Sequence, residues 1–172
     1  QVDLKGIEDG YGAVAHARWN GAELDLVRVS PWAPGADEPV EAAAEFRVAL
    51  SSGEMTQLMH SCDLLLAPNH SEEGFGLPAA EAMASGLPVI MTRIPSYLSF
   101  GSPHDYALFA EQGDAVAMGD ALLELLYSEG LRQRLRLRGR QIAEQFHADD
   151  VAVRMESFFN ERRKLRGGTA DV

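Results

Sequence analysis

Predicted strands and helices alternate along the whole chain, and this alternation restricts the possible folds more than any other feature of the sequence. Two of the predicted strands, 63–68 and 87–92, are short and largely apolar runs, which are typical of strands covered by helices on both faces. The pattern therefore predicts an α/β fold, with a Rossmann-like parallel sheet flanked by helices. Further strands are expected at 23–30, 46–50 and 106–110, and a loop at 96–105. Helices are expected at 7–20, 40–44, 53–61, 77–85, 115–126, 129–146 and 149–164.

The composition argues against several classes of partner. Lys and Arg number 15 against 26 Asp and Glu, which leaves a net charge of -11. Nucleic acids and anionic membrane surfaces attract proteins through a dominant basic face, so neither is expected as a partner. No apolar run approaches the ~20 residues of a transmembrane helix. Cys62 is the single cysteine, so the chain can form no internal disulfide, and a reduced, cytoplasmic setting fits.

The densest cluster of chemically useful residues is the segment 68–81, PNHSEEGFGLPAAE. A predicted strand ends at Pro68, a glycine-rich loop follows, and a helix begins near Leu77. Gly74 and Gly76 allow backbone amides to approach a ligand closely. The start of a helix adds free N–H groups and about half a positive charge. The segment therefore predicts a site for an anion, most simply a phosphate, held by local fields in an acidic protein.

Two carboxylates flank this loop. Glu73 precedes the first glycine, and Glu81 lies one turn into the predicted helix. Acids repel a phosphate, so their role must be a different one. Carboxylates accept paired hydrogen bonds from the neighbouring hydroxyls of ribose and hexose. A phosphate site between two such acceptors matches a nucleotide sugar.

The run EGFGLPAAEAMASGLPV, residues 73–89, resembles the E-x7-E signature of the family 4 (group 1) retaining glycosyltransferases. The surrounding order is similar too, with CDLLLAP before the run and Gly113-Asp114 after it. The resemblance implies the C-terminal, donor-binding domain of a two-domain GT-B enzyme. Such an enzyme transfers a hexose from a nucleoside-diphosphate (NDP) sugar to an acceptor hydroxyl with retention, and needs no metal or other cofactor.

The resemblance also assigns roles to residues. It implies that Glu73 contacts the donor hexose and Glu81 the ribose. The backbone between them, at Gly74, Phe75, Gly76 and Leu77, would face the sugar and the diphosphate. Lys5-Gly6 is similar to the family's Lys-Gly pair, whose lysine meets the diphosphate, which makes Lys5 a catalytic candidate beside Glu73. The loop spacing leaves Glu72 as an alternative to Glu73, and adjacency to Gly74 favours Glu73.

The resemblance further implies how the chain is organised. We expect a Rossmann-like nucleotide-sugar-binding domain over 1–165 and a frayed tail at 166–172. The domain's first strand, which would lie centrally in the sheet, is expected to be missing. The acceptor would bind to an N-terminal domain of the same enzyme, so these residues alone should be inactive. Such a protein would be cytoplasmic, either free or held at a membrane surface by that other domain.

Other interpretations fit the same residues less well. The run from Gly74 to Ala79 also matches the dinucleotide fingerprint G-x-G-x-x-A, but no acid lies near Arg93, where that motif needs one. The five histidines show no metal-ligating spacing, although His70 lies in the site loop. A non-catalytic module that binds nucleotides or sugars or docks a partner remains an alternative, as does a GT-B epimerase or phosphorylase.

Overall fold

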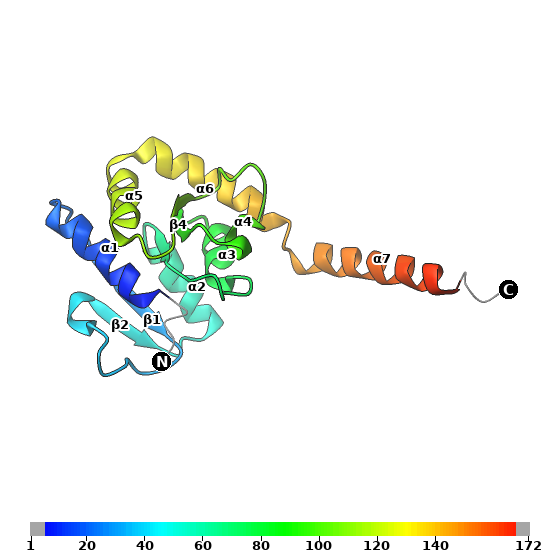
Figure 1. The fold of residues 1–172 in the computed structure, drawn as a ribbon, viewed down its shortest axis with the longest axis horizontal. Coiled ribbons are helices and arrows are strands. Elements are labelled where there is room, and N and C mark those ends of the chain that lie inside the picture. Colours follow the sequence, from blue (N-terminus) through cyan, green and yellow to red (C-terminus); the bar gives the residue numbers. More distant parts are fainter. Residues whose placement is uncertain (1–5, 168–172) are drawn as a thin grey trace.

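The computed structural model describes residues 6–167, whose five short strands form two parallel sheets (Figure 1). In the smaller sheet, β1 (Val27–Ser30) pairs with β2 (Glu45–Val48). The larger sheet has the order β3 (Leu65–Ala67), β4 (Val89–Thr92), β5 (Leu108–Ala110). Every pairing is parallel, as the sequence predicts.

The strands of the described residues divide between two sheets that share no pairing. The described residues contain no strand before the first helix, and none of them pairs β1 with β3. The strand expected at 23–30 is also shorter than predicted, because only its last four residues pair with β2.

The predicted helices are present, with ends that differ by a few residues. One helix, α4, was not predicted. It begins at Pro95, one residue before the segment 96–105 that was expected to be a loop. Pro95 occupies its first turn, where a missing N–H costs nothing. The described residues contain α1 (Ile7–Trp19), the 3₁₀ helix η1 (Val40–Ala42), α2 (Ser52–Ser61), α3 (Leu77–Ala84), α4 (Pro95–Leu98), α5 (Ala115–Tyr127), α6 (Glu129–Glu144) and α7 (Ala148–Gly167).

Strand β4 is buried on both faces, which explains its unbroken apolar sequence. Val89 and Met91 point into one core, which is shared with α2 and α3 and which we call the α3-side core. Ile90 points into a second core with α1 and α5, the α5-side core. All three side chains are fully buried. Helix α6 belongs to both layers, since it contributes Ile142 to the first core and Leu131 and Leu135 to the second.

Helix α7 projects away from this body (Figure 1). Its apolar side chains Val153, Met155, Phe158 and Phe159 are exposed. The helix extends through Gly167, and the rest of the predicted tail, 168–172, lies outside the described residues. Across the described part of the chain, no helix is both long and apolar enough to cross a bilayer.

Candidate functional site

The glycine-rich loop joins the carboxyl end of β3 to the start of α3, as the sequence predicts. Ligands of parallel α/β sheets bind at this edge. Helix α3 begins after Gly76, which has a φ of 83° and provides no side-chain cap. Pro78 occupies the first turn, where its missing N–H costs nothing. The helix therefore starts with an open N-terminus directed at this edge of the sheet.

The backbone amides of this loop have no acceptors within the described protein. Neither a carbonyl nor a side chain in the described residues accepts from the N–H groups of Gly74, Phe75, Gly76 or Leu77. The first turn itself closes through the amides of Ala79 and Ala80, which both donate to the Gly76 carbonyl. Unpaired amides at a helix start form a ready site for an anion. The sequence predicts a phosphate site at this loop, and the open amides leave that prediction to be tested by binding.

The two glycines of the loop serve different purposes. A Cβ atom on Gly76 would lie 2.2 Å from the Tyr97 ring, so the loop backbone rests directly on that ring. A Cβ atom on Gly74 would meet no atom within 4 Å. Packing therefore requires glycine at Gly76, whereas at Gly74 the space beside the backbone is open to a ligand.

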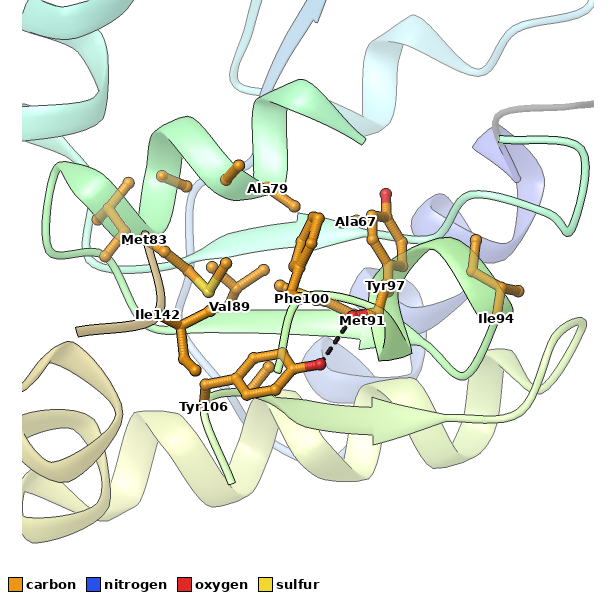
Figure 2. Packing of buried hydrophobic residues seen from close by; sticks show 14 of the residues in the cluster. Ala67, Ala79, Met83, Val89, Met91, Ile94, Tyr97, Phe100, Tyr106 and Ile142 are labelled. Atoms are coloured by element: carbon orange, nitrogen blue, oxygen red, sulfur yellow. Dashed lines mark hydrogen bonds between the residues drawn. The ribbon is translucent and has the colours of Figure 1, made fainter. Parts of the chain in front are cut away.

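The glycine loop packs on an aromatic layer formed by Phe75, Tyr97, Phe100, Tyr106 and Phe146. The Phe75 ring meets Phe100 at 5.1 Å and Phe146 at 5.3 Å between centroids, both edge-on. Tyr97 and Phe100 lie next to each other in the α3-side core (Figure 2). The Tyr106 hydroxyl donates to the Tyr97 carbonyl at 2.7 Å, drawn as the dashed line in Figure 2. Burial raises the pKa of Tyr106 to about 12, so this hydroxyl remains a donor at neutral pH.

Glu73 is held in place from the end of β3. Its Oε2 accepts from Asn69 Nδ2 at 2.6 Å, and its backbone N–H donates to the His70 carbonyl at 3.0 Å. Asn69 in turn accepts from the Tyr97 hydroxyl at 2.7 Å. The neighbouring Glu72 is exposed and makes no side-chain hydrogen bond to any residue that the structure describes. The structure therefore favours Glu73 over Glu72 as the oriented carboxylate.

Glu81 has a contrasting environment. It is the fifth residue of α3, and its side chain is exposed. No hydrogen bond or ion pair joins its carboxylate to the rest of the described chain. One carboxylate of the predicted pair is thus oriented by the protein, and the other faces solvent one turn above the open helix start.

A second helix start lies beside the loop. Gly6 is the N-cap of helix α1, and a Cβ added to it would fall 1.9 Å from the Pro68 carbonyl oxygen at the end of β3. Asp9, in the first turn of α1, binds His70 Nε2 at 2.9 Å. The predicted site residue Lys5 directly precedes Gly6 and lies outside the described residues.

The sequence places Asn69 within the predicted site segment, 68–81, but indicates no role for it, and it does not identify Tyr97 as part of this site. Asn69 stands directly after a predicted strand, at the edge where ligands bind, and that position is a usable signal. Tyr97 lies 28 residues further along, in a segment expected to be a loop. No local pattern connects the two residues, because their contact depends on how β3 and α4 pack.

The chain is similar to known proteins in both sequence and structure. Residues 38–142, which include the loop and α3, match the family model of the glycosyl transferases group 1. A similar relative is the MMP alpha-(1->4)-mannosyltransferase of Mycolicibacterium hassiacum, 32% identical over 93% of this chain and 41% of the relative. The sucrose-phosphate synthase of Thermosynechococcus elongatus has a similar structure, with a TM-score of 0.77 and 22% identity over 96% of this chain and 43% of the synthase.

A second similar structure is the C-terminal domain of a glycosyl transferase group 1 protein, LpcC from Francisella tularensis. It has a TM-score of 0.67 and 21% identity, and the match covers 83% of this chain and 79% of that domain. Against whole proteins the coverage is smaller. The chain spans between 25% and 41% of the lengths of the curated relatives named as mannosyltransferases.

Proposed function

This chain belongs to the group 1 glycosyl transferases, and from that premise we propose that it forms the donor-binding domain of a retaining GT-B enzyme. The enzyme would transfer a hexose from an NDP-sugar to an acceptor hydroxyl. One observation carries the proposal: four consecutive amides without acceptors in the described chain lie between two carboxylates, at the carboxyl end of β3. An amide cluster suits a diphosphate, and the flanking carboxylates suit the sugar hydroxyls on either side of it.

The loop amides and the α3 start would act on the leaving diphosphate. Negative charge grows on this group as the bond to the hexose breaks, and donors already aimed at it stabilise the transition state. Lys5 would add a positive charge from the α1 side, where Gly6 meets the end of β3. The net charge of -11 makes these local donors necessary, since the protein as a whole repels an anion.

The two carboxylates would divide the recognition of the donor. Glu81 lies one turn above the helix start, where a diphosphate bound to the loop amides would place its ribose. Glu73 lies at the other end of the glycine loop, toward the hexose. Each carboxylate would accept two hydrogen bonds from a hydroxyl pair. No metal takes part in the proposed mechanism.

The names of two relatives suggest which hexose to test first. Relatives in Mycolicibacterium hassiacum and Mycobacterium leprae are named as mannosyltransferases, both 32% identical over their matched segments. We propose mannose as the transferred sugar on this ground. The acceptor would bind to a separate domain that closes over the donor from the side of the loop.

Calorimetry of two variants tests whether Glu81 binds the ribose and Glu73 the hexose. A hydrogen bond to a charged group is worth about 1.5–3 kcal/mol, and ~1.4 kcal/mol is a factor of ten in affinity. Glu81→Gln should therefore lower the affinity for both NDP and NDP-mannose roughly ten- to a hundredfold. Glu73→Gln should lower the affinity for NDP-mannose alone. UDP, GDP and ADP are compared first, and the tightest is used.

Glu72→Gln is the matched control, because it makes the same change of charge beside Glu73 on an exposed side chain. It should leave both affinities unchanged. Equal losses of NDP affinity in the Glu73 and Glu81 variants, or no loss in either, would contradict the proposed roles.

We also expect no sugar transfer from these 172 residues alone. The roles proposed above assign the described site to donor binding alone, and the similar synthase structure is more than twice as long as the part matched. Release of NDP from NDP-mannose in the presence of acceptors measures this directly. Transfer by the isolated chain would show that the acceptor site lies within it.

A further inference from the structure

We propose that Asn69 and Tyr97 are positioning residues, which hold the Glu73 carboxylate in the orientation that receives the donor hexose. This inference rests on the role proposed above for Glu73. The observation behind it is a continuous chain of side-chain hydrogen bonds from the α3-side core to the loop. Tyr97 bonds to Asn69 at 2.7 Å, and Asn69 bonds to Glu73 at 2.6 Å.

The chemistry of the three groups gives this chain one direction. An ionised carboxylate only accepts hydrogen bonds, so the Asn69 amide must turn its Nδ2 toward Glu73. Its Oδ1 then faces Tyr97 and needs a donor, which the Tyr97 hydroxyl provides. Without that hydroxyl the Asn69 Oδ1 would lose its donor, and the amide would be held from the Glu73 side alone. Tyr97 therefore fixes the position of Asn69 from the core side, and Asn69 in turn orients Glu73.

Tyr97 is suited to this task because its side chain is restrained by the packing around it. Its side chain is 1% exposed, and its ring lies directly under Gly76. Burial, with a smaller contribution from the Glu73 carboxylate, raises the pKa of Tyr97, so its hydroxyl stays protonated and remains a donor at neutral pH.

The same ring thus sets two parts of the site. Through Gly76 it fixes the position of the amide loop, and through Asn69 it fixes the carboxylate at the other end of that loop. Donors and acceptors that are already ordered lose less conformational entropy when a ligand binds than mobile ones do. A bound hexose would therefore meet an acceptor whose orientation is already determined by the buried core.

Tyr97→Phe and Asn69→Ala test the inference on this chain. Both should bind the tightest of UDP, GDP and ADP as the unchanged protein does, and bind its mannose conjugate roughly three- to tenfold more weakly. Tyr106→Phe is the matched control, since it removes another buried hydroxyl from the same aromatic layer. An equal loss with Tyr106→Phe would indicate a general loosening of α4 and would overturn the proposal.

A double-mutant cycle shows whether Asn69 affects NDP-mannose binding through Glu73 or independently of it. If Asn69 acts through Glu73, adding Asn69→Ala to Glu73→Gln should cause no further loss of NDP-mannose affinity. Additive losses would overturn the proposal. Should Tyr97→Phe fail to fold, as judged by its thermal melt, Asn69→Ala carries the test, because Asn69 is only half-buried.

A ligand-free measurement keeps this inference distinct from the proposed function. The side-chain carboxyl ¹³C resonance of Glu73 can be assigned from its loss in Glu73→Gln. It should shift in Asn69→Ala and Tyr97→Phe, and stay in place in Tyr106→Phe. An unchanged resonance in the first two variants would refute the positioning chain. A changed resonance with a Glu73→Gln variant that binds NDP-mannose normally would instead refute the role of Glu73 in binding the hexose.

Discussion

Gly76→Ala should destabilise the fold by about 2–5 kcal/mol and abolish measurable NDP binding. The backbone has a φ of 83° here, and a left-handed conformation costs a residue with a side chain about 1–2 kcal/mol. The new methyl group would also lie 2.2 Å from the buried Tyr97 ring, and such overpacking costs about 1–3 kcal/mol. Urea unfolding measures the loss of stability. Calorimetry measures NDP binding, because any relief of the clash must displace the loop amides.

Gly74→Ala is the matched control, since the same methyl group would meet no protein atom within 4 Å. Its stability should stay within about 0.5 kcal/mol of the unchanged protein. The proposed function makes a second expectation for it: the methyl group would occupy space reserved for the donor, so NDP-mannose affinity should fall. Equal losses of stability in the two glycine variants would show that contact with Tyr97 does not shape the loop.

Phe100→Ala should destabilise the fold by about 3–5 kcal/mol, the usual cost of deleting a buried phenyl ring. Phe100 is 1% exposed and lies within 5.8 Å, between ring centroids, of Phe75, Tyr97 and Phe146. The cavity would also remove support from Phe75 in the glycine loop. We therefore expect weaker NDP binding even under conditions in which the variant is folded. Chemical unfolding and calorimetry measure the two effects.

Phe159→Ala makes the same chemical change on the projecting helix α7, where the ring is 60% exposed. Its effect on stability should be within about 0.5 kcal/mol, and NDP binding should not change. A large loss with Phe159→Ala, or a small one with Phe100→Ala, would contradict the assignment of the stabilising core to the layer beneath the loop.

The sequence by itself determined the class of fold and predicted the place of the site. Alternating strand and helix patterns are local, so the apolar run of β4 and the helix starts at Leu77 and Ala115 are legible without the structure. The motif around Glu73 and Glu81 is local too, because its spacing across one loop and one helical turn brings its parts together on a short stretch of chain. Membership of the glycosyltransferase family follows from that motif, and the comparisons confirm it.

The tertiary structure alone decided how the site is supported. The division into two sheets depends on which strand edges meet, and strand periodicity carries no information about that. Asn69 and Tyr97 are 28 residues apart and meet because β3 and α4 pack around the same aromatic layer. Likewise, the sequence does not distinguish the structural roles of Gly74 and Gly76, but of the two only Gly76 packs against a buried ring. Local spacing determines which amides and carboxylates the loop carries, whereas packing between distant segments determines which of these groups are fixed in orientation.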